Sequence, residues 1–325
     1  MSLRQQLDDS ARWDAEYGHN LASHLPMALT ALARLGADDA RREAFAHAYA
    51  TRLHAAPPRA PWPAGEAWQG RFGDPHSWPA YRSLFDDWID YEGAPVVLAQ
   101  ALPALLRGVG AAAFHGPIRA AYAVAAGHSH ELADALAYWA CRWFALGPPP
   151  RGGAEHEPAT LLARLRVAKP GPSLIAERMA LAATDPAVAA AVPTLHIDRE
   201  ATLGQLATLA ARLYAQSRNF TVLHLVTSAH ALRVLLPWLD DDDVADALGH
   251  YWLAYAAGHV ASGLAQGVGP ALPGAALPWA TIVARAIASD DDHLIKLVDS
   301  CREQERAYGG EVWREAASRA VVGPA

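Results

Sequence analysis

The amino-acid sequence predicts an all-α fold, in which one large, non-repeat, multi-helix domain encloses a central cavity. Apolar residues recur at helical spacing along most of the 325 residues, and no segment shows the convincing alternation of a half-buried strand. No heptad seam and no solenoid period is present. Because 52% of the residues are hydrophobic, the chain can bury a large core. We therefore expect residues 1–325 to form a single helical domain, with two closely packed halves, 1–146 and 154–325, as the alternative.

Helix starts and stops near the N-terminus are marked by capping residues. Ser23 is placed to cap the second expected helix, Pro26 fits its first turn, and Gly36 stops it. Asp38 or Asp39 then caps a third helix. Helical periodicity continues along the rest of the chain. Helices are expected over residues 3–17, 26–35, 39–53, 81–91, 95–107, within the alanine-rich run 120–144, and over 159–167, 173–183, 202–217, 220–239, 244–265, 278–288, 291–307 and 311–321.

Two segments are expected to be irregular. Residues 57–79 are rich in proline, glycine and tryptophan, and we expect an ordered surface loop there because Trp62, Trp68 and Trp78 need partners that bury them. Residues 147–153 contain three consecutive prolines between glycines, which makes this short segment the one candidate hinge between the halves.

Composition excludes several classes of function. The net charge of −7 and the lack of a Lys/Arg-rich patch argue against binding to nucleic acid, because phosphate recognition needs clustered cations. Cys141 and Cys301 are far apart and are expected to be buried reduced thiols. We expect no hydrophobic signal region and no apolar stretch long enough to cross a bilayer, and hence a cytoplasmic protein without a membrane partner.

The familiar signatures of nucleotide cofactors and of nucleophilic catalysis are also absent from the sequence. There is no Gly-x-Gly-x-x-Gly, no P-loop and no Gly-x-Ser-x-Gly elbow. Metal motifs carried by one helix, such as His-Glu-x-x-His and Glu-x-x-His, are missing as well. If a metal site exists, its ligands must therefore come from distant parts of the chain.

His115 has the most informative setting of the fifteen histidines. It stands two residues before Pro117, which can open a helix, so its backbone is held near the first turn and its ring can point away from the helix body. The helix that follows is apolar on every side, as is typical of a buried helix, so His115 is expected to face the interior. His24 repeats the arrangement with Pro26.

Three further histidines, His224, His230 and His293, lie in apolar or sharply punctuated segments. A buried imidazole needs a partner for each ring nitrogen, and several imidazoles that converge from distant helices are most economically satisfied by a metal ion. For any one of them taken alone, the alternative is a hydrogen-bonded core histidine.

Lysine usage adds a second signal. Twenty-seven residues are basic, and only Lys169 and Lys296 among them are lysine. Lys169 precedes Pro170 in an expected loop, whereas Lys296 shares a helix face with His293 three residues earlier. Unlike arginine, lysine can be neutralised by burial or near a metal, or converted to a carbamate that binds as a carboxylate. Spacing alone favours the alternative, an exposed lysine paired with the acidic run at residues 290–292.

Four segments, taken together and in order, resemble the questin oxidase-like family. They are His-Leu-Pro-Met at 24–27, Phe-His-Gly-Pro-Ile-Arg at 114–119, Leu-His-Leu-Val-Thr at 223–227 and Asp-His-Leu-Ile-Lys-Leu at 292–297. The resemblance implies an all-helical mono- or dioxygenase that uses dioxygen on polycyclic aromatic ketones such as anthraquinones, by Baeyer–Villiger-like oxygen insertion or by ring cleavage. It also implies a non-haem iron, Fe(II), held mainly by histidines, and a lysine that can carry a carbamate. Whether NADPH serves as reductant is left open.

Carried over position by position, the resemblance implies a metal-ligand set, with His230 in reserve and with Lys296 also in a catalytic role. The set is His24, His115, His224, His293 and Lys296. From the residues themselves, Arg119 and Arg233 are candidates to bind a phenolate or carboxylate of the substrate, with ion pairs to Glu131 or Asp240 as the alternative.

A planar substrate also needs aromatic walls, for which Tyr122, Trp139 and Trp143 are candidates or else ordinary core residues. Two other classes of function stay open. One is a metal-free helical protein that binds a hydrophobic ligand, and the other is a hydrolase in which Zn²⁺ held by histidines activates water.

Overall fold

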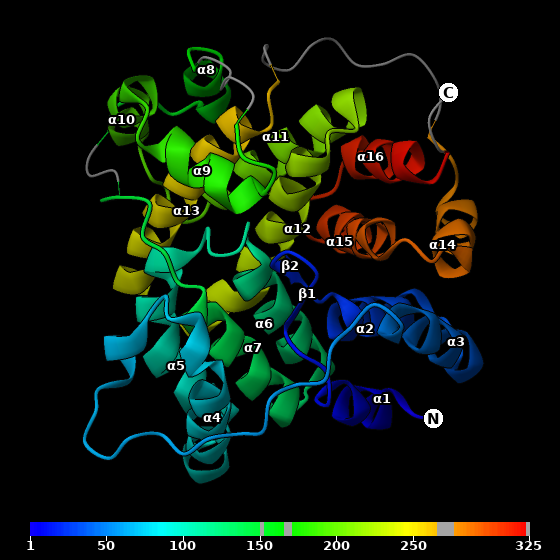
Figure 1. Ribbon diagram of the computed structural model, residues 1–325. Coiled ribbons are helices and arrows are strands. Elements are labelled where there is room, and N and C mark those ends of the chain that lie inside the picture. Colours follow the sequence, from blue (N-terminus) through cyan, green and yellow to red (C-terminus); the bar gives the residue numbers. More distant parts are fainter. Residues whose placement is uncertain (150–152, 166–170, 265–275, 323–325) are drawn as a thin grey trace.

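The computed structural model describes residues 1–149, 153–165, 171–264 and 276–322, and these residues are mostly helical (Figure 1). Strand structure in them is limited to a short antiparallel ribbon, β1 (Glu16–Tyr17) with β2 (Leu21–Ala22). The predicted all-α class is confirmed. Lys169 lies outside the described residues, as do the ends of the helices predicted over 159–167 and 244–265 and the central part of the candidate hinge at 147–153.

The α-helices follow one another with short connections. In the first half they are α1 (Leu3–Ser10), α2 (Leu25–Leu35), α3 (Asp39–Ala50), α4 (Trp78–Glu92), α5 (Ala94–Leu105), α6 (His115–Ala126) and α7 (Ser129–Cys141). In the second half they are α8 (Pro158–Leu162), α9 (Ile175–Ala183), α10 (Pro186–Ala191), α11 (Thr202–Ser217), α12 (Phe220–Leu235), α13 (Asp241–Ala261), α14 (Trp279–Ala288), α15 (Asp292–Tyr308) and α16 (Val312–Val321). Short 3₁₀ turns are η1 (Trp68–Arg71), η2 (Pro75–Ser77), η3 (Leu106–Gly108), η4 (Val192–Thr194) and η5 (Leu236–Trp238).

The N-terminal segment departs from its prediction. The helix expected over residues 3–17 ends at Ser10, because Glu16 and Tyr17 instead pair with Ala22 and Leu21. The ribbon reverses through Gly18 and Asn20, both with positive φ. Its return strand leads directly into His24 at the start of α2.

Caps at α2 and α3 were predicted in part. Gly36 ends α2 in the left-handed conformation, at φ 100°, and Asp38 caps α3 by accepting a hydrogen bond from the backbone N–H of Arg41 at 2.8 Å. The predicted Ser23 cap is wrong, since the residue at the N-cap of α2 is His24. Its side chain makes no capping bond, because its Nδ1 is directed to Asp292 of α15 instead.

The tryptophan-rich segment at residues 57–79 is ordered, as predicted. Figure 1 shows this segment crossing the lower front of the molecule between α3 and α4. Trp78 is buried, and Trp62 and Trp68 are half-buried against the core. The segment contains η1 and η2, and α4 begins at Trp78, three residues before the predicted start.

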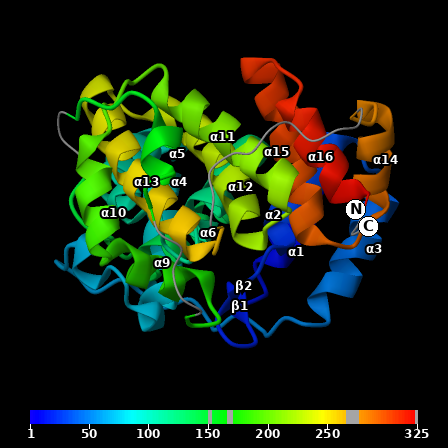
Figure 2. The same cartoon turned by 90° about the horizontal axis from the view of Figure 1, so that it is seen from above.

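Helices from both halves pack together at the centre of the molecule. α12 contacts α6 from the first half and α11, α13 and α15 from the second, and α2 contacts both α6 and α15. Figure 2 shows the same central position of α12 from above. This packing brings the start of α2, the start of α6, the first turns of α12 and the start of α15 toward one another.

One expectation about apolar stretches is wrong. The segment Phe220–Trp238, which is α12 with η5, is long and apolar enough to cross a membrane by length and composition. However, 72% of its apolar window is buried inside the protein, which is typical of a central core helix.

Candidate metal centre

Four imidazoles from four helices meet at this central junction. They belong to His24 before α2, His115 at the first position of α6, His224 in the second turn of α12 and His293 in the first turn of α15. Ring centroids lie 4.6 Å apart for His24 and His115, 4.5 Å for His24 and His293, 5.0 Å for His115 and His224, and 5.5 Å for His224 and His293. One ring nitrogen each of His24, His115 and His293 lies within 4.8 Å of the other two. We call these four residues the imidazole cluster.

His115 is oriented by an unusual backbone turn. Ala112, Ala113 and Phe114 precede it with φ of 47°, 56° and 68°, a left-handed run without glycine. Such a conformation costs roughly 1–2 kcal/mol per non-glycine residue. It brings the carbonyl of Ala112 against the ring of His115, whose Nδ1 donates a hydrogen bond to it. The strain therefore lies where it fixes one imidazole of the cluster.

The remaining three imidazoles also have their Nδ1 atoms engaged. Nδ1 of His224 donates to the carbonyl of Phe220 at 2.9 Å, and Nδ1 of His24 donates to Oδ2 of Asp292. Nδ1 of His293 lies 3.5 Å from the same carboxylate oxygen of Asp292. A proton fixed on Nδ1 leaves Nε2 of a neutral imidazole as the lone-pair donor.

An orphaned nitrogen supports the fit of a cation to this site. Nε2 of His115 is buried and has no hydrogen-bond partner in the described part of the chain. A buried acceptor left unpaired costs about 1–3 kcal/mol, and a cation that accepts its lone pair would relieve that cost. Neutral imidazoles on several helices are ligands that suit iron, zinc and copper.

The electrostatics keep the cluster neutral. Burial lowers the pKa of His24 and of His115 well below the usual value, and lowers the pKa of His224 to about 4. The pKa of His293 is lowered most, again by burial first. The charge of Lys296 contributes to the lowering in all four, so the lysine lies close to them. Near neutral pH the rings are therefore unprotonated, as metal ligation requires.

Lys296 is not the exposed lysine that spacing alone favoured. It lies one turn after His293 on α15, and only 2% of it is exposed. Burial lowers its pKa to about 8, against the opposing charges of Asp292 and Asp291. A substantial fraction of this amine is thus neutral near pH 8, which is the form that can act as a nucleophile or ligand.

Asp292 is a site residue that sequence reasoning missed. It was considered only as part of an acidic run near a helix start, but its carboxylate contacts the rings of both His24 and His293. The residue is buried, whereas its neighbours Asp290 and Asp291 are exposed. The available signal was its position directly before a candidate ligand, since carboxylates commonly orient metal-binding imidazoles.

Replacing Asp292 tests this orienting role. Asp292→Asn is expected to weaken metal affinity about 10–100-fold, because the amide cannot hold the protonated Nδ1 of His24 as the carboxylate does. Competition titration with a chelator measures the change, and Asp290→Asn, at an exposed residue of the same run, is the matched control. Wild-type affinity in Asp292→Asn would contradict the role.

His230 is not brought to the imidazole cluster. It lies six residues after His224 on α12, which places it about 9 Å along the helix axis and on a different face. Its described contacts are the ring of Tyr122 at 6.3 Å between centroids and Nη2 of Arg233 at 3.4 Å. Its reserve role as a ligand is therefore not supported, and the core-histidine interpretation fits.

The buried His230 makes stability depend on pH. Burial lowers its pKa from 6.5 to about 3, so its contribution is complete above pH 6.5 and is lost as the pH falls toward 3. Between pH 7 and pH 5 we expect a loss of about 2 kcal/mol in the free energy of unfolding from this residue. Denaturant titration of metal-free His230→Leu should show a pH dependence flatter by that amount. The exposed-site control His47→Ala should keep the wild-type slope, and an unchanged slope in His230→Leu would contradict the assignment.

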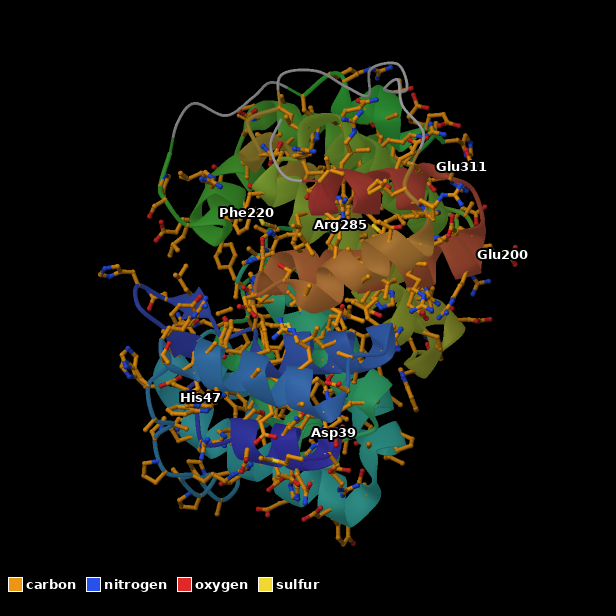
Figure 3. All side chains as sticks on the ribbon, turned by 90° about the vertical axis from the view of Figure 1, so that its right-hand side faces the viewer. Asp39, His47, Glu200, Phe220, Arg285 and Glu311 are labelled. Carbon is orange, nitrogen blue, oxygen red and sulfur yellow. The ribbon has the colours of Figure 1, made fainter. Side chains whose placement is uncertain are left out.

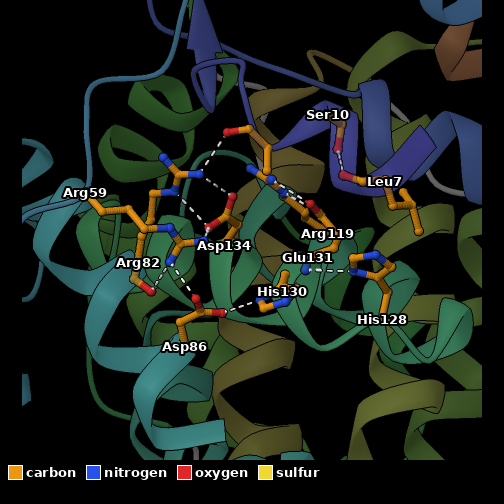
Figure 4. Close-up of polar contacts among 11 residues, drawn as sticks. Leu7, Ser10, Arg59, Arg82, Asp86, Arg119, His128, His130, Glu131 and Asp134 are labelled. Atoms are coloured by element: carbon orange, nitrogen blue, oxygen red, sulfur yellow. Dashed lines mark hydrogen bonds and ion pairs between the residues drawn. The ribbon is translucent and has the colours of Figure 1, made fainter. Parts of the chain in front are cut away.

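Arg119 is held in a buried ion pair away from any free role. Its Nε and Nη2 donate to the two carboxylate oxygens of Glu131 at 2.7 and 2.9 Å, and both residues are at most 4% exposed (Figure 4). The structural alternative is thus the arrangement observed, and a substrate-binding role for Arg119 is not supported. Likewise Arg233 donates to Oε1 of Gln304 at 3.0 Å rather than pairing with Asp240 as suggested.

The Arg119–Glu131 pair is expected to matter for stability rather than for metal binding. Arg119→Met leaves a buried, unpaired carboxylate, and should destabilise the protein by about 3–5 kcal/mol in urea denaturation. Because an apolar pair of similar volume is often neutral, the double variant Arg119→Met/Glu131→Leu should recover most of that loss. Metal content should be unchanged in both. Full stability of Arg119→Met with loss of function would instead restore the catalytic role.

Comparison with known proteins was made with this geometry in hand. The sequence model described as Questin oxidase-like matches residues 19–301 of the 325-residue chain. The matched span contains the four residues of the imidazole cluster together with Asp292 and Lys296. A search of curated proteins finds no match.

Proposed function

The chain belongs to the questin oxidase-like family and is an oxidoreductase, and from this premise we propose that it is a non-haem iron-dependent oxygenase acting on a polycyclic aromatic ketone of the polyketide class. The observation that carries the proposal is the meeting of four neutral imidazoles, from four helices, beside one buried lysine. Dioxygen is the proposed co-substrate.

The proposed ligands are the four imidazoles of the cluster and Lys296. The neutral amine of Lys296 can add to CO₂ and release a proton, which gives a carbamate whose oxygens bind like those of a carboxylate. Because the pKa of Lys296 is lowered to about 8, this addition becomes favourable at a pH where an exposed lysine is still an ammonium. Iron(II), when bound, supplies the activation of dioxygen and Lewis acidity toward a ketone oxygen.

The chain's own residues orient the ligands and keep them in one protonation state. Ala112 and Phe220 fix the Nδ1 protons of His115 and His224 through backbone carbonyls, and Asp292 does the same for His24. Backbone carbonyls cannot titrate or rotate away, so the tautomers are set by the fold. Burial of all four rings limits access of bulk water to the reacting atoms.

Oxygen uptake tests the proposal. Iron-loaded protein is incubated with ¹⁸O₂ and a panel of hydroxylated anthraquinones and related ketones, with and without NADPH, and the products are analysed by mass spectrometry. We expect ¹⁸O in the product, loss of turnover after chelation, and recovery with Fe(II) but not with Zn(II). Turnover that persists in the chelated protein, or product oxygen that comes from water only, would contradict an iron oxygenase.

A further inference from the structure

Phe220 combines exposure with contact to the imidazole cluster. It is the first residue of α12 and is 53% exposed, although its ring centroid lies 4.7 Å from that of His293 and 5.0 Å from that of His224. Other exposed aromatic residues in the described part of the chain, such as Tyr91 and Phe144, have no described ring contact with the cluster. In Figure 3 Phe220 lies at the left edge of the molecule, between the green helices and the blue ones.

The position of Phe220 is fixed by its neighbours. Oδ1 of Asn219 caps α12 by accepting hydrogen bonds from the backbone N–H groups of Thr221 and Val222, and its Nδ2 donates to the carbonyl of Ser262 at 2.8 Å. Arg178 of α9 donates to Oγ1 of Thr221 at 3.3 Å. Contacts from two other helical segments thus hold the start of α12, so the exposed ring is placed beside the cluster by the fold.

Backbone and side chain of Phe220 face different tasks. The carbonyl accepts the Nδ1 proton of His224, while the ring covers His224 and His293 on the side that reaches solvent. A side-chain substitution therefore removes the ring and leaves the hydrogen bond that orients His224 intact. The two roles can be separated experimentally.

The aromatic walls suggested from the sequence are less suited to contact a substrate. Trp139 is fully buried, and its Nε1 donates to the carbonyl of Gly108 at 3.1 Å. Trp143 lies beyond the end of α7, where it stacks on Phe72 at 5.0 Å. Tyr122 is buried and donates to the backbone carbonyl of Lys296 at 3.3 Å. These three act as core residues, which leaves Phe220 with an accessible aromatic face at the cluster.

We propose that Phe220 is the stacking platform for the substrate, a positioning and specificity-determining role that rests on the proposed function. The exposed ring face receives one ring of a planar polycyclic ketone, so that the ketone oxygen is directed toward the imidazole cluster. Planar aromatic ligands gain roughly 5–150-fold in affinity from one stacking side chain, as measured by alanine substitution in single-stranded nucleic-acid complexes. A non-planar or aliphatic ketone would gain little from this ring.

The test compares four iron-loaded proteins: wild type, Phe220→Ala, Phe220→Tyr and Phe144→Ala. The probe is 1,8-dihydroxyanthraquinone, whose visible absorption is followed as protein is added, and iron content is measured on each sample. Phe144 is the matched control because it is 51% exposed and lines a different hollow of about 270 Å³ with Leu146 and Leu174.

We expect saturable binding to the wild type, a dissociation constant raised roughly 10–100-fold in Phe220→Ala, and near wild-type binding in Phe220→Tyr and Phe144→Ala. Iron content should be equal in all four. Wild-type affinity in Phe220→Ala, an equal or greater loss in Phe144→Ala, or loss of iron from Phe220→Ala would overturn the platform alone. A wild type that binds iron but not the probe would overturn the proposed substrate class and the platform with it.

Discussion

His115→Ala and His293→Ala are each expected to remove the metal from the protein while leaving its helical circular dichroism largely intact. Each ring contributes one nitrogen to the three that lie within 4.8 Å of one another. Loss of a ligand should cost more affinity than the roughly 10–100-fold seen when an outer partner of a ligand is removed. The helices need not unfold, because the core around them is built from apolar contacts that these substitutions do not touch.

Two measurements check this result. Elemental analysis gives the metal content, and far-ultraviolet circular dichroism gives the helix content of the same samples. His47→Ala, at an exposed position on α3, controls for the mere removal of an imidazole and should keep its metal. If both His115→Ala and His293→Ala retained full metal, the ligand set would be wrong.

Substitutions of Lys296 should separate three roles for this buried side chain. Lys296→Arg keeps a permanent charge in the cluster, which repels a cation, and should lose the metal most completely. Lys296→Met removes both charge and ligand and should bind weakly. Lys296→Glu supplies a carboxylate in place of a carbamate and should recover part of the affinity. The magnitude is large because the position is 2% exposed and solvent screens little there.

Bicarbonate provides the second readout for Lys296. Iron loading of the wild type should rise with added bicarbonate and with pH through about 8, where the amine loses its proton. Loading of Lys296→Glu should not respond to bicarbonate, since no amine is present. Equal iron content in wild type and Lys296→Arg would show that this lysine is not a ligand.

The sequence signals that predicted the site were local, and local signals were sufficient for His24 and His115. A histidine two residues before a proline is held at the start of a buried helix, and both residues lie there. For His224 and His293 the apolar or punctuated context gave the same expectation. That these four rings lie side by side follows from the packing of α2, α6, α12 and α15, which no local pattern contains.

The features that were missed all depend on long-range contacts. Asp292 meets His24 across 268 positions of the chain, and spacing alone had favoured an exposed Lys296. The left-handed turn at Ala112, Ala113 and Phe114 contains no glycine, so the sequence gives no sign of it. Helix class was easier, because periodicity is a property of each segment, whereas the end of α1 at Ser10 follows from strand pairing with residues further along.

Metal analysis of protein purified without chelators tests the central claim most directly. The four neutral imidazoles and Lys296 are proposed to hold one ion, so mass spectrometry of the as-isolated protein should find about one iron per chain. Iron should fall with each ligand substitution and remain in His230→Leu. Zinc in place of iron would favour a hydrolase, and a protein that binds no metal even when Fe(II) is supplied would contradict the account and leave a helical binding protein.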